Sequence, residues 1–290
     1  MKKEWLTGYS FTLPSMVLLA ILVIYPLILT LTYSLSDMSL TSSRYLGWAA
    51  YAKLFSNKML PLIFKNSIIW TVLVVIFQLL MGLGSALVLN KPFFGRSLVR
   101  GIMILPWVMP GVIAAMVWRL IYDPQLGLLN HFLKNLGIID HYLTWLSIPG
   151  TALYAVIFAA IWKGFPFSML MYLAGLQGVP PELYEAADID GAGRWKQFLS
   201  VTLPSMRPII TITFLLTFIW TFNYFELIYV MTGGGPAEST HIFPTYVYDL
   251  AFKRFRFGAA SGFAVLDFLF LLLFSLFYVR LSLHRGGVDS

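Results

Sequence analysis

The stretch PPELYEAADIDGAGRWKQFLSVTLP, residues 180–204, stands apart from the rest of the chain because it is polar. Glu182, Glu185, Asp188 and Asp190 are four of the thirteen acidic residues, and all four fall between positions 182 and 190. Elsewhere the chain is apolar: 59% of its 290 residues are hydrophobic and 11% are charged, against about 25% charged residues in soluble domains. The composition indicates a membrane protein, and we expect this stretch to lie in water.

Long apolar runs on both sides of this stretch can each cross a bilayer as a helix, which needs about 20 mostly apolar residues. The runs are continuous rather than alternating, and this excludes a transmembrane β-barrel. We therefore predict an all-α membrane protein with six transmembrane helices. The predicted spans are Tyr9–Leu35, Asn66–Asn90, Val99–Ile121, Leu153–Leu176, Met206–Met231 and Ala259–Leu283.

The runs divide the chain into four predicted parts. Residues 1–37 form a retained N-terminal transmembrane helix, because the apolar run is too long for a signal peptide. Residues 38–65 form an extracytoplasmic loop, residues 66–284 a five-helix core that contains 180–204, and residues 285–290 a cytoplasmic tail. Six spans put both termini on one side, and a slight excess of Lys and Arg in the shorter connections places that side in the cytoplasm.

The residues of 180–204 predict two short helices joined by a turn. Pro180 and Pro181 end the fourth span and favour a new helix start. Glu182 and Glu185 are expected in the first turn of that helix, where carboxylates favour the positive end of the helix dipole. Gly191 can end the helix and turn the chain, and residues 194–201 can form a second helix. Acidic groups are poorly suited to an anionic lipid surface, which favours a protein partner.

The order of residues here closely resembles the EAA loop of ABC-importer permeases. That pattern runs Glu-Ala-Ala, two residues, Asp-Gly-Ala, then Phe, a β-branched residue and Leu-Pro. The matching positions are Glu185, Ala186, Ala187, Asp190, Gly191, Ala192, Phe198, Val201, Leu203 and Pro204. Two further stretches, WKGFPFSMLMYLAGLQGVP (162–180) and TFNYFELIYVMTGGGP (221–236), are similar to the carbohydrate branch, which includes maltose, glycerol-phosphate and multiple-sugar permeases.

The resemblance implies a type I ABC-importer permease fold, with the chain forming half of a sugar translocation path in a prokaryotic inner membrane. It also implies four kinds of partner: a second homologous permease subunit, two cytoplasmic ABC ATPase subunits, an extracytoplasmic solute-binding protein and a sugar. The chain has no Gly-x-x-x-x-Gly-Lys-Ser/Thr pattern, so ATP and Mg²⁺ are expected on the ATPase and no cofactor on this chain. The implied ATPase-coupling residues are Glu182, Glu185, Ala186, Ala187, Asp190, Gly191 and Ala192.

Ionisable residues inside spans are costly and are functional candidates, and Lys163, Glu226 and Asp267 qualify. We expect Gly164 and Pro166 to interrupt the fourth span and open a cavity beside Lys163. Lys163 then contacts the substrate path, or instead pairs with Glu226 or snorkels to an interface. Asp267 has no matching motif, and pairing within the bundle and contact with a partner subunit both stay open for it. By resemblance, the residues of the substrate path are Trp162, Lys163, Gly164, Phe167, Thr217, Trp220, Thr221, Asn223 and Tyr224.

Three other functions remain as alternatives. An ion-coupled secondary transporter would show inverted repeats and midplane carboxylates, and it would leave the 180–204 segment unexplained. A membrane enzyme would need clustered catalytic groups, and the sequence shows no nucleophile–base arrangement. An ABC permease for a non-sugar substrate fits the loop but not the 221–236 stretch. No metal is expected, because His131, His141, His241 and His284 lack metal-ligand spacing and favour surface or interfacial positions.

Overall fold

The structure is a computed structural model that describes residues 2–285, with side-chain burial given for 11–282. The predicted tail therefore lies outside the described residues, apart from Arg285. The chain divides into two compact units, Met1–Pro61 with Tyr246–Leu273 and Leu62–Thr245 with Phe274–Ser290. Each unit is almost wholly helical, as predicted, and each is described separately below.

The first unit contains the first apolar span and a small hairpin. Residues Phe11–Ser34 form a continuous helical span in which Ser34, at its end, is the buried residue, so its apolar side chains are free to face lipid. The hairpin pairs Asp37 with Arg44, and the Lys53 ammonium lies 2.9 Å from the Asp37 carboxylate. This hydrogen bond with Lys53 lowers the pKa of Asp37. The elements are α1 (Lys2–Leu19), the π-helical turn η1 (Ala20–Ile24), α2 (Tyr25–Ser34), β1 (Ser36–Met38), β2 (Ser43–Tyr45), α3 (Ala49–Phe55), the π-helical turn η3 (Asp249–Lys253) and the first part of α15 (Phe257–Arg285).

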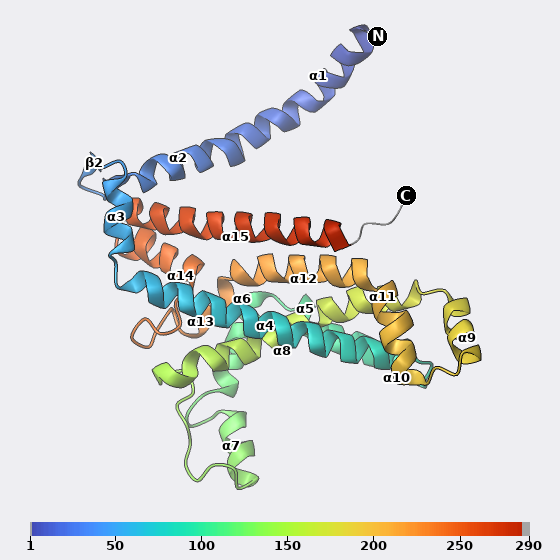
Figure 1. The fold of residues 1–290 in the computed structure, drawn as a ribbon. Helices are drawn as coiled ribbons and strands as arrows, with labels where there is room; N and C mark the ends of the chain where they lie inside the picture. The colour runs from blue at the N-terminus through green and yellow to red at the C-terminus, as the bar shows by residue number, and fades with distance from the viewer. Residues whose placement is uncertain (1, 286–290) are drawn as a thin grey trace. The chain divides into compact units, whose positions relative to one another are not determined.

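The second unit is a bundle whose central helix is α8 (Figure 1). Small and aliphatic side chains of α8, among them Val156 and Ala159, are fully buried. Gly82 lets α4 approach the α8 main chain at Ser168 so closely that a side chain would not fit, a packing mode typical of membrane helices. The elements are α4 (Met59–Asn90), α5 (Arg96–Val108), α6 (Gly111–Ile121), α7 (Leu128–Asn135), α8 (Pro149–Gln177), α9 (Pro181–Ile189), α10 (Arg194–Gln197), the π-helical turn η2 (Phe198–Thr202), α11 (Leu203–Ser205), α12 (Arg207–Phe222), α13 (Glu226–Met231), α14 (Phe243–Tyr248) and the end of α15.

Five of the predicted spans correspond to helices long and apolar enough to cross a membrane. The third does not: Val99–Ile121 was predicted as one helix, whereas α5 and α6 meet at 97°. The cause is the Met109–Pro110 pair. Proline restricts the preceding residue to extended backbone, and Met109 has a ψ of 133°. The second predicted span also begins earlier, at Met59 rather than Asn66.

The expected interruption of the fourth span is also wrong. Helix α8 runs unbroken through Gly164 and Pro166. A proline inside a helix removes one main-chain hydrogen bond, and in membrane helices such a loss is tolerated when neighbouring helices compensate. Here α5, α6, α12 and α13 pack against α8, and α4 contacts it at Ser168 and Ala160, so neighbouring helices surround the proline.

The loop after α6 is fixed by polar side chains. The Asp123 carboxylate accepts hydrogen bonds from the main-chain amides of Gln125 at 2.9 Å and Leu126 at 2.8 Å. These amides lower the pKa of Asp123. Asn130 on α7 donates to the Leu143 carbonyl at 3.0 Å and accepts from the Trp145 indole at 2.9 Å. The segment between α6 and α8 is therefore held by hydrogen bonds around the short helix α7.

Candidate functional site

A cavity of about 290 Å³ lies within the second unit, between the helices that surround α8. Its lining comes from parts of the chain far apart in sequence: α4, the α5–α6 break, α8, and the α12–α13 junction. The lining residues are Trp70, Val74, Gln78, Trp107, Gly111, Ala160, Lys163, Gly164, Phe167, Thr217, Trp220, Thr221, Tyr224 and Glu226. Mostly apolar walls with a few polar groups are typical of small-molecule sites.

Aromatic rings form two groups in the cavity wall. Phe167 joins Trp107 and Trp220, with ring centroids 6.0 and 4.9 Å apart respectively. Trp70 lies 6.2 Å from Tyr224. The Trp70 indole donates to the Thr221 carbonyl at 2.9 Å, so its one donor is satisfied and its orientation is fixed. These rings provide flat apolar surfaces at defined positions.

Polar groups from three helices reach the same space. The Gln78 amide donates to the Ala160 carbonyl at 3.0 Å and so ties α4 to α8. The Thr217 hydroxyl is buried and has no hydrogen-bond partner within the described part of the chain. A buried hydroxyl without a partner is unfavourable unless something else bonds to it. The cavity therefore offers Thr217 to a ligand.

Lys163 holds the broken third span in place. Its ammonium donates to the Met109 carbonyl at 2.7 Å and to the Trp107 carbonyl at 3.5 Å. Carbonyls at the end of a helix lack partners within the helix, and a cation there also favours the helix dipole. The Lys163 ammonium therefore satisfies the end of α5, while Glu226 lines the same cavity from α13.

Two glycines keep the cavity open. A side chain at Gly164 would overlap the Gln78 amide, and one at Gly111 would overlap the Glu226 carboxylate. Gly111 is the first residue of α6, directly after the break. The break of the third span places Trp107 and Gly111 in the cavity wall. Gly111 and Gly164 leave room for the long side chains of Glu226 and Gln78.

Seven of the nine residues predicted for the substrate path line this cavity: Lys163, Gly164, Phe167, Thr217, Trp220, Thr221 and Tyr224. Trp162 does not, and its ring instead packs at 5.6 Å from Trp118 in the core. The Asn223 amide donates to the Ile219 carbonyl at 3.4 Å and is not part of the lining. Whether the seven contact substrate stays a prediction.

Sequence reasoning missed the contributions of α4 and of the third span. Trp70, Val74 and Gln78 recur every four residues and so share one helix face, and Gln78 is a polar residue in an apolar span. Trp107 and Gly111 lie within the LPWVMPG stretch, residues 105–111, and discontinuous spans often mark binding sites in transporters. Both signals were available in the sequence.

The 180–204 segment folds as predicted in outline. Helix α9 starts after Pro180, Gly191 adopts a φ of +69°, and a second helix begins at Arg194. Glu182 lies in the first turn of α9, but Glu185 lies one turn further on, because Pro181 is the first helical residue. The second helix continues through the π-helical turn η2 into α11, rather than ending at Val201.

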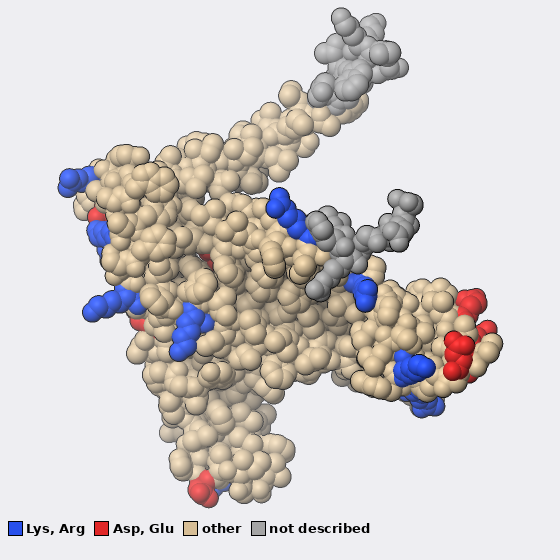
Figure 2. All heavy atoms as spheres, in the orientation of Figure 1, with Lys and Arg blue, Asp and Glu red and all other residues tan. Residues whose placement is uncertain are grey.

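Among the predicted coupling residues, those of α9 are accessible and Ala192 is not. Glu182, Glu185 and Ala186 are exposed, Ala187 is half-buried and Ala192 is buried. Acidic side chains gather at the outer end of this segment, over α9 (Figure 2). Apolar side chains accompany them, with Ile189 88% and Trp195 72% exposed. Large apolar side chains exposed beside polar ones suit a protein partner, because protein interfaces combine an apolar centre with a polar rim.

Hydrogen bonds between the two short helices fix their geometry. The Gln197 amide donates to the Asp188 carboxylate on α9 and, at 3.0 Å, to the Ala192 carbonyl in the turn. The hydroxyls of Tyr184 and Thr202 are 2.9 Å apart. Tyr184 also packs against the buried cluster around Tyr172 and Met206. Through this cluster α9 is in contact with residues of α8 and with the start of α12.

Of the histidines, His241 departs from the expected surface or interfacial position. Its side chain is 3% exposed, and its Nε2 atom lies 3.0 Å from the Glu238 carboxylate. Long-range contacts bury this loop: Asn66 donates to the carbonyls of Ser239 and His241. His131 is hydrogen-bonded to the Tyr142 hydroxyl at 2.8 Å. The His284 side chain lies outside the described residues.

A multi-span helical bundle with a cavity between its helices and an ordered polar segment is the architecture expected of a membrane transport protein. Residues 78–284 match the model of the family described as binding-protein-dependent transport system inner membrane component. The chain belongs to this family and is a transmembrane permease component of an ABC importer. The family is a transport component, so the ion-coupled transporter and the membrane enzyme are set aside.

Relatives named as sugar permeases match over nearly the whole chain. It is 33% identical to the trehalose/maltose transport system permease protein of Thermococcus litoralis over 288 residues, which cover 98% of this chain and 96% of the relative. It is 32% identical to the sulfoquinovosyl glycerol transport system permease protein of Agrobacterium fabrum, covering 92% and 87%. A probable ABC transporter permease protein of Brucella suis is 35% identical, covering 94% and 96%.

Solved structures agree with the sequence comparisons. A chain of a bacterial ABC transporter involved in the import of the acidic polysaccharide alginate superimposes with a TM-score of 0.86 at 25% identity, covering 99% of this chain and 98% of that one. The same TM-score is found for the alginate transporter in complex with an alginate pentasaccharide-bound periplasmic protein. A methionine ABC transporter, at 18% identity and a TM-score of 0.57, shows the fold alone.

Proposed function

We propose that this chain forms half of the translocation path of an ATP-driven carbohydrate importer. The observation that carries the proposal is the cavity, whose lining combines two groups of aromatic rings with Thr217, a buried hydroxyl that has no partner among the described residues. Sugar rings present apolar faces suited to aromatic surfaces and hydroxyls suited to such polar groups. Relatives named for sugar transport support the same substrate class.

The partners of the chain follow from this function. A second homologous permease completes the path, two cytoplasmic ATPase subunits bind ATP and Mg²⁺, and an extracytoplasmic solute-binding protein delivers the sugar. The alginate transporter in complex with its periplasmic protein supports the last of these. Both termini and the 180–204 segment then lie in the cytoplasm, where the segment meets the ATPase.

The 180–204 segment couples the ATPase to the cavity. The ATPase would contact the exposed residues of α9, with Glu185 accepting hydrogen bonds from partner groups. Closure of the ATPase dimer moves α9, and the contacts of Tyr184 with Thr202 and the buried cluster pass this motion to α8 and α12. Those two helices carry Lys163, Phe167 and Trp220, so the cavity changes its access from one side of the membrane to the other.

The substrate class is tested with the complete importer reconstituted in vesicles. The binding protein encoded beside this chain is first screened for ligands by thermal shift, and we expect a mono- or oligosaccharide to stabilise it. Uptake of that sugar should require ATP and the binding protein. Stabilisation by amino acids or peptides but by no sugar would overturn the carbohydrate assignment and favour a non-sugar ABC permease.

The link between the two short helices gives a second expectation. Gln197→Ala removes two hydrogen bonds, which together stabilise the loop geometry by about 1–3 kcal/mol net of competition from water. Because Asp188 is exposed, we expect the lower end of that range and a roughly fivefold loss of transport. The measurement is sugar uptake per ATP hydrolysed in reconstituted vesicles.

The matched control is Lys196→Ala, which truncates the exposed neighbour of Gln197 and should leave the ratio of uptake to hydrolysis unchanged. Equal amounts of assembled complex must be recovered for both variants by size-exclusion chromatography. If Gln197→Ala transports as efficiently as the natural protein, the two hydrogen bonds have no part in coupling.

A further inference from the structure

The connection between α4 and α5 and the first turns of α5 carry three cations without a carboxylate nearby in sequence. These are Lys91, Arg96 and Arg100, and no Asp or Glu occurs between Asp37 and Asp123. Within the described residues, none of the three side chains forms a hydrogen bond or an ion pair, and the Arg100 Nε atom is buried without a partner. Unpaired cations at partly buried positions are unfavourable unless an anion joins them.

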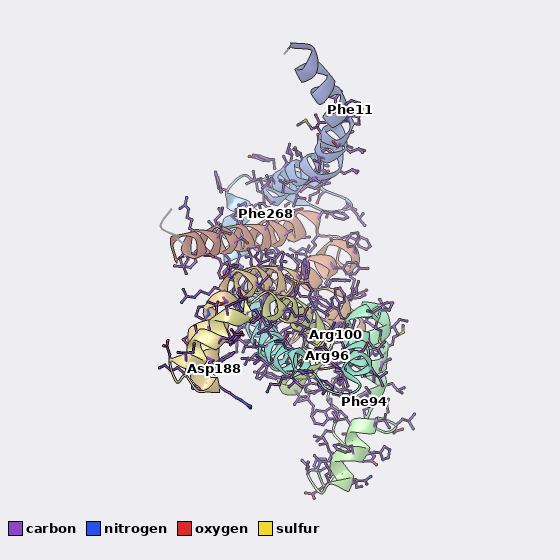
Figure 3. The ribbon with its side chains drawn as sticks, turned by 90° about the vertical axis from the view of Figure 1, so that its right-hand side faces the viewer. Phe11, Phe94, Arg96, Arg100, Asp188 and Phe268 are labelled. Atoms are coloured by element: carbon purple, nitrogen blue, oxygen red, sulfur yellow. The ribbon has the colours of Figure 1, made fainter. Side chains whose placement is uncertain are left out.

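The geometry brings the arginines together on one face. Arg96 and Arg100 are four residues apart on α5 and therefore share a face of that helix (Figure 3). Gly95, with a φ of +80°, turns the chain into α5 at this point. Lys91 directly follows Asn90, the last residue of the α4 span, so the cluster lies at the end of an apolar span.

Large apolar side chains accompany the cations. Phe94 is fully exposed, and Phe93 is 40% exposed. On α5 itself Leu98 and Ile102 are also exposed, at 69% and 58%. Aromatic rings and arginines side by side at the end of a span are typical of the membrane interface, where apolar groups enter the lipid and cations meet the headgroups.

We propose that Lys91, Arg96 and Arg100 bind the headgroup of an anionic phospholipid, with Phe93 and Phe94 inserted beside its acyl chains. Charge complementarity selects this occupant: basic groups at a membrane surface attract lipids with net negative charge, and Arg presents a planar fork suited to phosphate oxygens. The site lies outside the cavity lining, and its occupation does not depend on what the importer carries.

The test uses the full chain, purified in neutral detergent and placed in nanodiscs of phosphatidylcholine with a small fraction of fluorescent phosphatidylglycerol. Energy transfer from a donor dye attached to a single cysteine introduced in place of Ser97 reports lipid bound near the cluster. We expect phosphatidylglycerol to be enriched over phosphatidylcholine carrying the same dye, with the enrichment falling as salt is added. Equal enrichment of both lipids would overturn the proposal.

Variants localise the effect. Arg96→Gln with Arg100→Gln should weaken phosphatidylglycerol binding about thirtyfold, since each cation near a membrane surface contributes about a factor of five. Arg44→Gln with Lys58→Gln removes the same charge elsewhere and should change nothing. The variant Arg96→Lys with Arg100→Lys keeps the charge and should retain most of the binding. If the Gln variant does not fold, the Lys variant still tests the proposal, because loss of its phosphatidylglycerol enrichment would contradict a site based on charge. Undiminished binding by a folded Gln variant contradicts the site.

Discussion

Gly191→Val should abolish most transport while the importer still assembles. Gly191 has a φ of +69°, a backbone conformation that is disfavoured for residues with a Cβ atom by about 1–2 kcal/mol and most strongly for β-branched ones. The turn between α9 and α10 would then populate its docking geometry five- to thirtyfold less often. The measurement is the amount of sugar taken up per ATP hydrolysed by the reconstituted complex, and this ratio should fall.

The structure supplies a matched control at the same position. Nothing lies within 4 Å of the place where a Cβ atom would stand at Gly191, so backbone strain rather than collision decides the outcome. Asn adopts positive φ far more readily than Val, and Gly191→Asn should therefore keep most of the activity. Full transport by Gly191→Val, or equal loss in both variants, would show that the left-handed turn is not what the loop requires.

Local signals made the 180–204 segment predictable. Pro180, Pro181 and Gly191 each impose a backbone conformation through their own chemistry, whatever surrounds them. The helix starts and the turn therefore follow from neighbouring residues alone. The Gln197 contacts did not follow, because they depend on how closely the two short helices approach each other.

The cavity was predictable only in part, since its walls come from separate spans. The α8 and α12 residues were identified by resemblance, yet the physical reason offered for the opening was wrong. Pro166 lies in a helix enclosed by neighbours and stays helical, whereas Pro110 lies between two half-helices and breaks the third span. A sequence shows that a proline is present, but the packing around it decides whether the helix bends.

Gly164→Leu should prevent sugar transport through loss of the cavity. A Cβ atom at this position already overlaps the Gln78 amide, which is fixed by its hydrogen bond to Ala160. The remaining carbons of Leu would occupy part of the cavity that Gly164 lines. Overpacking costs typically 1–3 kcal/mol, and the loss of ligand volume adds to this, so we expect uptake to fall by more than about tenfold.

Controls separate blockage from misfolding. Gly84 lies on α4 with nothing within 4 Å of its Cβ position, and Gly84→Leu should assemble and transport normally because its side chain has room. Gly164→Ala adds only the colliding atom, and the three atoms nearest to it all belong to the Gln78 side chain. Its defect should therefore be relieved by Gln78→Ala, which removes the amide. If the double variant is no better than Gly164→Ala alone, Gly164 matters for helix packing elsewhere, and the cavity does not depend on the room that this glycine leaves for Gln78.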